Sequence, residues 1–466
     1  MGAPLLWLQV IRGEQMDYFN LKFHGASIKN EIFAGITMFI AMSYILVVAP
    51  TLLSQAGMPY DGVFLSTVLV SGVVTIISSL YTKLPIAFAP GLGILSTFFS
   101  YAVGDEALDY SYLLLAIYVS GILFLMLSKF GVYQIVMDVM DLEFRRMLMS
   151  GIGLALFLYG ISTTGLLQKK GSIYLLGSVD FILLLITFIS LLSIYVTKKK
   201  GLKSHMLYGL SIAYVLGMIY DYYLNGYQAG ISVSNYLYNI FNTTHELSDM
   251  KKITFCFPDI TPIISNSKSL LAFLNLVFVF SITHFFDAIG TNSSVFEAID
   301  LYIDQRIKDD NSLKKTITID GVGNVLSGLF GISTVTTYAE SLVGVLSGGK
   351  TGVTALVTGI CFLSCIFISP LFTSIPTIVA APVLIYVGLN LLKHYRDFHK
   401  RKPIINLYGI FLIVYLGITF KTGTVITYGL FGYILLTAFV EHKKPVKHWW
   451  IVLIFMFLQL APKLYL

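Results

Sequence analysis

Charged residues are scarce in this chain of 466 residues. Lys, Arg, Asp and Glu together make up 12% of it, whereas hydrophobic residues make up 56%. Soluble domains average about a quarter charged residues, so this composition excludes an ordinary soluble protein and predicts a multi-pass membrane protein. Cysteine is also rare: Cys256, Cys361 and Cys365 are the only three, and their spacing excludes a disulfide framework and a CxxC metal site. The net charge of +6 is spread over loops, which indicates membrane orientation and gives no sign of a nucleic-acid partner.

Apolar stretches recur along the chain, and a helix needs about 20 such residues to cross a bilayer. The candidates are fifteen stretches, several of them too short to cross alone: 32–50, 61–82, 84–103, 110–128, 146–166, 176–196, 206–223, 269–290, 317–331, 332–347, 352–373, 376–392, 403–420, 424–440 and 449–463. A cytoplasmic N-terminus puts the basic loops 198–203, 304–315 and 393–402 inside, as the positive-inside rule requires. The long polar insert 224–268 is then extracellular, and no soluble domain is expected.

Two segments in corresponding positions of the two halves break the helical pattern. Pro90 and Gly91 interrupt the stretch 84–103, and a run of serines, threonines and valine weakens 332–347. Interrupted segments in matching positions indicate a transporter built from inverted repeats, with its site near the membrane midplane. Broken backbone inside a membrane is tolerated only where protein or a water-filled cavity surrounds it. We therefore expect the two segments to face each other beside a bound ligand.

Few ionisable residues fall inside the predicted spans, and such residues are functional candidates by default. Glu340 is interpreted as a carboxylate that accepts ring N–H groups of a polar substrate or carries a proton, with a purely structural carboxylate as the alternative. His284 and Asp287 are spaced i, i+3, which predicts one helical face; each is either a substrate or proton-relay group or a packed structural residue. Asp320 is interpreted as the N-cap of the helix that begins GVGNVL.

Aromatic residues are abundant, and most are expected to face lipid or the membrane interface. Five lie near the broken segments, and each could stack on a planar ligand: Phe39, Tyr44, Phe98, Phe285 and Tyr338. The motif GGKTG at 348–352 lacks the spacing of a nucleotide-binding phosphate loop, so no ATP site is predicted.

Four stretches resemble signature sequences of the azaguanine-resistance-type purine permeases, the hypoxanthine, guanine and adenine branch of the nucleobase:cation symporter-2 superfamily. They are NEIFAGITMFIAMSYILVVAP (30–50), APGLGILSTFF (89–99), HFFDAIGT (284–291) and STVTTYAESLVGVLSGGKTGVTALV (333–357). The resemblance runs from about Ser27 to about Asn390, and its last block is the most specific.

The resemblance implies an all-helical polytopic fold like that of the uracil transporters. About fourteen transmembrane segments form two inverted repeats of seven, with segments 3 and 10 broken by short strands. Core segments 1–4 and 8–11 move against gate segments 5–7 and 12–14. The implied parts are a cytoplasmic lead 1–30, core 31–129, gate 130–224, extracellular loop 225–268, core 269–374 and gate 375–466. Fourteen segments are one fewer than the fifteen apolar stretches, so either 403–440 is one broken segment or the tail from 449 does not cross the membrane.

The resemblance also implies site residues. Glu340 matches the base-binding acid of segment ten, and Asp287 matches the second acid of an Asp-Phe-Phe-Asp run in segment eight. His284 stands where that run has its first acid, and Leu95 stands where an asparagine is usual. The implied substrate-binding residues are Glu340, His284, Asp287, Thr337, Tyr338, Gly93, Leu95 and Phe98, and the proton-coupling candidates are Glu340, Asp287 and His284. Imidazole in place of a carboxylate removes an acceptor, which favours ligands with more acceptor character, such as xanthine.

The expected function is import of a nucleobase, foremost a purine (guanine, hypoxanthine, adenine or xanthine), by proton symport with alternating access in the cell membrane. The proton is the coupling ion, no cofactor or metal is expected, and the architecture allows a homodimer. One alternative keeps the fold but carries another heterocycle or an anion, although an acid at position 340 would repel an anion. The other is an intramembrane metalloenzyme using His284, Asp287 and Glu340, for which the sequence offers no HExxH or GxSxG motif.

Overall fold

The computed structural model describes residues 16–103, 108–130, 142–170, 173–178, 180–202, 205–227, 251–258, 260–302, 312–368, 380–398, 402–419, 424–442, 449–450 and 453. Within these ranges, six helices are long and apolar enough to cross a membrane: Ile28–Gln55, Tyr60–Thr82, Tyr110–Lys129, Glu143–Ser162, Phe181–Lys199 and Ser267–Phe285. Several shorter apolar helices accompany them. The chain is therefore a multi-pass membrane protein.

The elements follow one another in two halves. The first contains α2 (Ile28–Met42), α3 (Ile45–Gln55), α4 (Tyr60–Thr82), β1 (Phe88–Pro90), α5 (Leu92–Val103), α6 (Tyr110–Lys129), α8 (Leu142–Ser162), the hairpin β2 (Leu167–Lys170) and β3 (Ile173–Leu176), α9 (Phe181–Lys199) and α10 (His205–Asp221). The second contains α13 (Thr261–Ser265), α14 (Ser267–Tyr302), α15 (Ser312–Phe330), β4 (Val335–Thr337), α16 (Ser341–Leu346), α17 (Gly352–Ser364), α19 (Ala380–Leu392), a 3₁₀ segment (Lys393–Phe398), α20 (Pro403–Thr419) and α22 (Leu430–Glu441). The stretches 403–420 and 424–440 thus form separate helices, and the tail beyond 453 lies outside the described residues.

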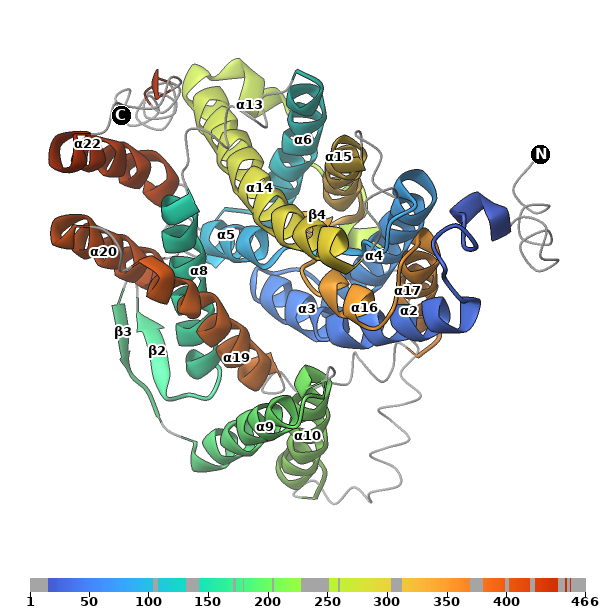
Figure 1. Cartoon of the computed structure of the whole chain (residues 1–466). Helices are drawn as coiled ribbons and strands as arrows, with labels where there is room; N and C mark the ends of the chain where they lie inside the picture. Colours follow the sequence, from blue (N-terminus) through green and yellow to red (C-terminus); the bar gives the residue numbers. More distant parts are fainter. Residues whose placement is uncertain are drawn as a thin grey trace.

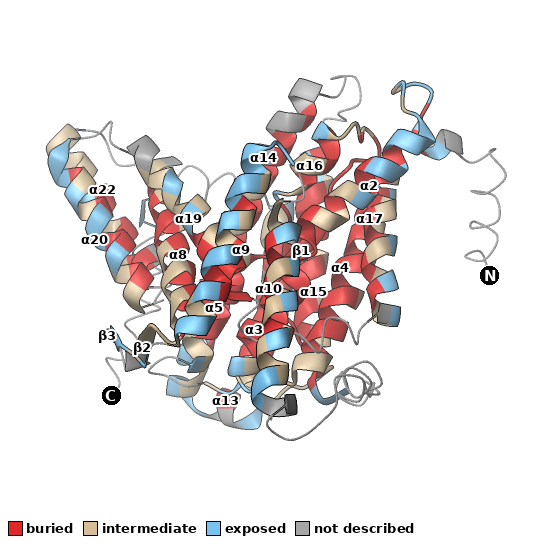
Figure 2. Cartoon of the chain, turned by 90° about the horizontal axis from the view of Figure 1, so that it is seen from below, coloured by how far each residue is buried: buried red, intermediate tan, exposed pale blue. Residues whose placement is uncertain are grey.

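The helices of the two halves interleave. Helix α15 packs against α6, and α17 packs against α4 and α2, so segments far apart in sequence form one compact group (Figure 1). Beside this group, α8 packs against α19 and α20, and α9 packs against α10. Buried residues concentrate on the helices around β1, while α9 and α20 expose one side (Figure 2). The exposed side chains there include Phe188 and Phe411, as expected of surfaces that face lipid.

Both segments that the sequence predicts to be interrupted are interrupted. The stretch 84–103 contains strand β1 followed by α5, and 332–347 contains β4 followed by the six-residue helix α16. The two strands pair antiparallel, with Ala89 opposite Thr336, in the interior of the molecule. Each strand thereby satisfies backbone groups of the other, as buried extended chain in a membrane requires. The pairing brings the beginnings of α5 and α16 to one place.

Asp320 helps to hold β4 in position. This carboxylate is fully buried, and its Oδ1 accepts hydrogen bonds from the backbone N–H of Thr337 at 2.7 Å and the hydroxyl of Thr336 at 2.8 Å. Its Oδ2 accepts from Nδ2 of Asn292 on α14 at 2.9 Å. The interpretation of Asp320 as a helix N-cap is wrong, because it lies in the middle of α15 and bonds to a strand.

Two further polar side chains of α15 continue this support. Asn324 accepts from the hydroxyl of Thr334 at 2.9 Å and donates to Ser120 on α6 at 3.2 Å. The hydroxyl of Ser327 accepts from the backbone N–H of Val335 at 3.0 Å. Helix α15 therefore takes the place of a second neighbouring strand along the buried edge of β4.

A second buried acid, Glu31 on α2, fastens the loop that follows α16. Its carboxylate is fully buried and accepts from the backbone N–H groups of Lys350, Thr351 and Thr354 at 2.9, 3.3 and 3.2 Å. The hydroxyls of Thr351 and Thr354 also donate to it, at 2.9 and 2.6 Å. The GGKTG turn thus presents its amides to an anion, as a phosphate loop does, but the anion is a side chain of the protein itself.

Replacing Glu31 by Gln should lower the stability of the protein. The side-chain amide keeps the volume but places a donor opposite three N–H donors, which should cost about 1–3 kcal/mol. The thermal unfolding midpoint of detergent-purified protein measures this. Glu143→Gln, at a half-buried position on α8 whose carboxylate accepts from Tyr433 at 3.4 Å, is the matched control. Equal midpoints for the two variants would contradict the role given to Glu31.

Candidate functional site

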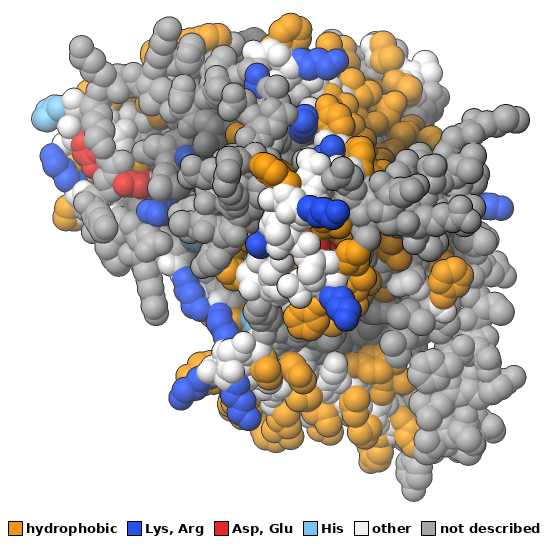
Figure 3. All heavy atoms as spheres, turned by 45° about the vertical axis from the view of Figure 1, so that its right-hand side comes forward, with side chains coloured by type: hydrophobic (Ala, Val, Ile, Leu, Met, Phe, Trp, Pro, Cys, Tyr) orange, Lys and Arg blue, Asp and Glu red, His pale blue; other side chains and the backbone are white. Residues whose placement is uncertain are grey.

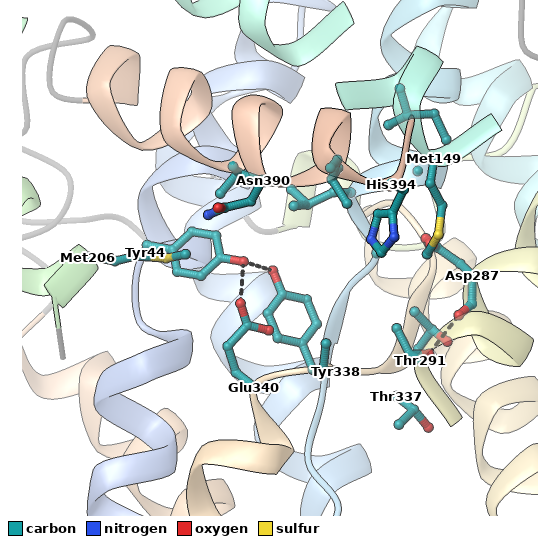
Figure 4. Close-up of a pocket in the computed structure, with 18 residues that line it drawn as sticks. Tyr44, Met149, Met206, Asp287, Thr291, Thr337, Tyr338, Glu340, Asn390 and His394 are labelled. Atoms are coloured by element: carbon teal, nitrogen blue, oxygen red, sulfur yellow. Dashed lines mark hydrogen bonds between the residues drawn. The ribbon is translucent and has the colours of Figure 1, made fainter. Parts of the chain in front are cut away.

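A cavity of about 320 Å³ opens where the two broken segments meet (Figure 4). Its volume lies at the lower end of the range typical of small-molecule sites. The lining residues are Tyr44, Gly91, Leu92, Gly93, Met149, Ile152, Met206, Asp287, Thr291, Thr336, Thr337, Tyr338, Ala339, Glu340, Val387, Asn390, Leu391 and His394.

The two walls of this cavity differ in chemistry. One wall comes from the paired strands, the beginnings of α5 and α16, the α2–α3 junction and α14, and carries both carboxylates together with hydroxyl groups. The opposite wall comes from α8, α10, α19 and the 3₁₀ segment and is mostly apolar, with Asn390 and His394 as its polar members. A ligand in the cavity would have polar groups on one side and aliphatic contacts on the other.

Glu340 lies directly before α16 and turns its carboxylate into the cavity. The hydroxyl of Tyr44 donates to Oε1 of Glu340 at 2.9 Å, and the hydroxyl of Tyr338 donates to that of Tyr44, also at 2.9 Å (Figure 4). Tyr44 occupies the break between α2 and α3, so this chain of hydrogen bonds joins two parts of the fold that lie far apart in sequence. The backbone N–H of Glu340 also interacts with this carboxylate, and no other side chain among the described residues donates to it.

Asp287 on α14 faces the beginning of α5. The backbone amides of Gly93 and Ile94 are close enough to interact with its carboxylate, where the positive end of the helix dipole favours negative charge. Its Oδ2 is buried and makes no hydrogen bond within the described residues. Asp287 therefore has acceptor capacity left for a ligand, and it shares the polar wall with Glu340.

Gly91 makes the close approach of Asp287 possible. A methyl group at this position would overlap Oδ2 of Asp287 and come within 2.9 Å of Cγ2 of Thr336. Gly91→Ala should therefore displace Asp287 or β4 and destabilise the fold by about 1–3 kcal/mol. Substrate affinity should fall together with the unfolding midpoint. Gly429→Ala is the control for the substitution itself, since it lies outside the cavity lining and a methyl group there would meet only side-chain atoms of Leu412 and Val425, at 3.0 and 3.3 Å. Unchanged affinity in Gly91→Ala would contradict the placement of Asp287.

The structure brings some of the sequence-predicted residues to the cavity and not others. Five line it: Gly93, Asp287, Thr337, Tyr338 and Glu340. Leu95 and Phe98 are buried in the core behind it, where Phe98 packs near Phe280. Their proposed contact with substrate stays a prediction that this conformation does not display.

His284 also lies outside the cavity lining. Its ring packs edge-on against Phe124 of α6 with centroids 4.4 Å apart, and neither ring nitrogen has a hydrogen-bond partner among the described residues. His284 and Asp287 are spaced i, i+3, which separates them by about 60° around α14. This is enough for His284 to contact α6 while Asp287 faces the beginning of α5 and lines the cavity. The role of His284 stays a prediction.

The residues of the apolar wall could not be predicted from the sequence. Met149, Ile152 and Met206 belong to ordinary apolar spans with no local pattern that marks them. His394 lies in a basic stretch that reads as a cytoplasmic loop, and Asn390 reads only as helix-end polarity, with Lys393 donating to it at 2.8 Å. Only the packing of one group of helices against the other identifies them.

Comparison with known proteins finds permeases similar to this chain. A family model described as "Permease family" matches residues 29–427. The chain is 29% identical over 438 residues to a putative permease of Methanocaldococcus jannaschii, covering 93% of this chain and 94% of that protein. It is 29% identical to the adenine permease AdeQ of Escherichia coli (80% and 79% covered) and 26% identical to the guanine/hypoxanthine permease PbuO of Bacillus subtilis (90% and 94%).

Two solved structures are similar in fold. The transmembrane domain of the cyanobacterial bicarbonate transporter BicA superposes with a TM-score of 0.60 at 18% identity, covering 87% of this chain and 97% of that one. The SLC26A9 structure superposes with a TM-score of 0.62 at 12% identity, covering 92% and 70%. At these identities the likeness shows the architecture alone.

Proposed function

Since this chain belongs to the permease family of the nucleobase:cation symporter-2 superfamily, we propose that it is a secondary active transporter that imports a nucleobase, foremost a purine, by proton symport. The relatives named above as adenine and guanine/hypoxanthine permeases support a purine. The observation that carries the proposal is the pair of broken segments, whose antiparallel strands bring Glu340 to the cavity that Asp287 of α14 also lines.

The chemistry of the polar wall suits a nitrogen heterocycle. Carboxylates accept hydrogen bonds from ring N–H groups, while the threonine hydroxyls can donate to ring nitrogens or carbonyl oxygens. The apolar wall with Met149, Ile152 and Met206 can cover the flat faces of a ring. Glu340 is the foremost base-binding and proton-carrying residue in this proposal, and Asp287 is the second carboxylate. The proton is the only coupling ion we propose, with no cofactor.

We propose fourteen transmembrane segments in two inverted repeats. They are α2 with α3, α4, β1 with α5, α6, α8, α9, α10, α14, α15, β4 with α16, α17, α19, α20 and α22. The core domain (31–129 and 269–374) then carries the polar wall, and the gate domain (130–224 and 375–466) carries the apolar wall. Movement of one wall against the other would expose the cavity to each side of the membrane in turn.

We place the protein in the cell membrane with its N-terminus in the cytoplasm, and this architecture is compatible with a homodimer. The support for orientation is the distribution of charge. Lys and Arg side chains are spread over the face shown in Figure 3, on which acidic side chains show in few places, and cytoplasmic faces carry such an excess. As permeases are transporters, we propose no enzymatic activity. The three residues of the metalloenzyme alternative do not converge, because His284 packs against α6.

An anion substrate is the second candidate, since a transporter of similar architecture, BicA, is named for bicarbonate. Two carboxylates in the cavity disfavour it, because like charges in a partly desolvated site repel strongly.

Uptake by proteoliposomes tests the proposal. Purified protein is reconstituted with the outer solution more acidic than the lumen, and radiolabelled hypoxanthine, guanine, adenine, xanthine and uracil are supplied separately. We expect saturable uptake of at least one purine that stops when a protonophore collapses the gradient. Accumulation of bicarbonate but of no base, against protein-free liposomes as the control, would overturn the proposal.

A further inference from the structure

Three oxygen-bearing groups form a continuous chain of hydrogen bonds on the polar wall. Tyr338 donates to Tyr44, and Tyr44 donates to Glu340, each at 2.9 Å. The three side chains come from three places, namely the α2–α3 junction, the residue after β4 and the residue before α16. All three line the cavity, and Figure 4 shows the two phenol groups converging on the carboxylate.

The direction of these hydrogen bonds depends on whether Glu340 carries a proton. A phenol has a single hydrogen to donate. When Glu340 is a carboxylate it can only accept, so Tyr44 donates to it, Tyr338 donates to Tyr44, and the Tyr338 oxygen has only lone pairs to offer the cavity. When Oε1 of Glu340 is protonated, its O–H donates to Tyr44. Tyr44 then turns its hydrogen to Tyr338, and the Tyr338 O–H is free to donate into the cavity.

We propose that Tyr44 and Tyr338 are a hydroxyl relay that converts the protonation state of Glu340 into a hydrogen-bond donor or acceptor presented to the substrate by Tyr338. The inference rests on the proposed transport of a base. The only covalent change is the proton that Glu340 gains or loses, and each hydroxyl keeps its own hydrogen and rotates. Tyr44 is a positioning residue in this scheme, and Tyr338 touches the substrate.

The relay gives a physical reason for a proton and a base to bind together. In the protonated state, Oε2 of Glu340 still accepts a ring N–H while Tyr338 donates to an adjacent acceptor. In the carboxylate state Tyr338 cannot donate, and its lone pairs repel that acceptor. The substrate class that fits is therefore a heterocycle with an N–H next to a carbonyl oxygen, an amide-type edge such as that of hypoxanthine, guanine, xanthine or uracil.

Other titratable groups also face Glu340 and will contribute to any pH dependence. Besides the two tyrosines they are Asp287 from α14 and His394 from the 3₁₀ segment. From α2, which packs against α16, the described acid is Glu31, which is held by the GGKTG turn. Substitution of the tyrosines leaves these acids and the histidine in place, so their contribution to the pH dependence is common to the wild type and the variants.

The test is equilibrium binding of tritiated hypoxanthine, guanine, xanthine, adenine and uracil to purified protein, from acidic to mildly alkaline solution. The variants are Tyr44→Phe and Tyr338→Phe. The matched control is Tyr159→Phe, at a buried tyrosine of α8 that packs against Phe99 away from the cavity lining. In the wild type, binding of a base with an amide-type edge requires one proton on the site. Its affinity should therefore fall by up to about tenfold per pH unit above the apparent pKa of the site. Both relay variants should bind the base about tenfold more weakly in acid, because one hydrogen bond to the base is lost. Their affinity should also change much less with pH, because Tyr338 no longer responds to the protonation of Glu340.

If either relay variant keeps the full wild-type dependence of affinity on pH, the proposed relay is wrong, while the proposed transport of a base stands. Binding of no base by the wild type at any pH would instead overturn the proposed function, and the coupling with it.

Infrared difference spectra between protein in acidic and in alkaline solution detect the protonation of Glu340 and its hydrogen bonding without any ligand. The carboxyl band that is missing in Glu340→Gln should shift in Tyr44→Phe and Tyr338→Phe and stay in place in Tyr159→Phe. A band that does not move in the two relay variants overturns the inference.

Discussion

Replacing Glu340 by Gln is expected to abolish accumulation of the substrate base. The substitution replaces the acid by a neutral amide, whose oxygen can still accept the ring N–H and whose NH₂ group can donate to Tyr44, as the protonated acid does in the relay. Equilibrium binding of the base should therefore persist and lose its pH dependence. Since Gln cannot carry the coupling proton, a gradient should no longer drive uptake at all. Initial uptake rates into proteoliposomes with an imposed proton gradient measure the effect.

Glu143→Gln on α8 is the control, since it makes the same substitution outside the cavity lining and should leave uptake unchanged. The anion alternative predicts the opposite for position 340. Removing a negative charge would then raise uptake of bicarbonate or sulfate, because it lowers repulsion in the site. Gradient-driven purine uptake that persists in Glu340→Gln would show that another group carries the proton.

Replacing Asp320 by Ala is expected to cause the largest loss of stability. The change leaves the N–H of Thr337, the hydroxyl of Thr336 and the amide of Asn292 without their acceptor in a fully buried place. Removing one member of such a network should cost about 3–5 kcal/mol. Strand β4 carries Thr337 into the cavity and leads to Glu340, so substrate binding should be lost along with stability. The unfolding midpoint and binding of radiolabelled base, measured on the same sample, test both effects.

Asp320→Asn separates the loss of charge from the loss of the acceptor. Its side-chain oxygen can still accept from Thr337, so the stability loss should lie between those of wild type and Asp320→Ala. If Asp320→Ala unfolds at the wild-type midpoint, the hydrogen bonds to β4 do not hold the strand, and another element must position Glu340.

Local chemistry explains why the broken segments could be predicted. Pro90 lacks an N–H and Gly91 weakens a helix, so a helix through the stretch 84–103 is unfavourable whatever surrounds it. Glu340 was identifiable for a similar reason, since an acid in an apolar stretch is costly unless it has a role. The antiparallel pairing of β1 with β4 joins residues about 250 positions apart. The family resemblance implied a short strand in each segment, but no local pattern specified that the two strands pair.

The partners of the buried acids could not be read from the sequence. Asp320 before GVGNVL resembles a helix cap, and only the fold shows that Thr337 lies beside it and that the helix continues through it. Glu31 resembles any acid at the start of a span, and only the fold shows that the amides of Thr351, the N-cap of α17, and of Thr354 in its first turn point to it. Tyr44 was identifiable as an aromatic residue that could stack on a ring. Its hydrogen bond to Glu340 depends on how α3 meets α16.

The measurement that tests the account most directly is protection of a thiol introduced at Ala339, beside Glu340. Ala339 is exposed and lines the cavity, whereas Leu346, at the other end of α16, is exposed and does not. Ala339→Cys and Leu346→Cys are made in a protein without Cys256, Cys361 and Cys365, and maleimide labelling is followed with increasing base. The account predicts that a transported base slows labelling at position 339, at concentrations matching its KM for uptake, and leaves position 346 unaffected. Unchanged labelling at position 339 by a base that the protein transports would contradict the claim that this cavity is the substrate site.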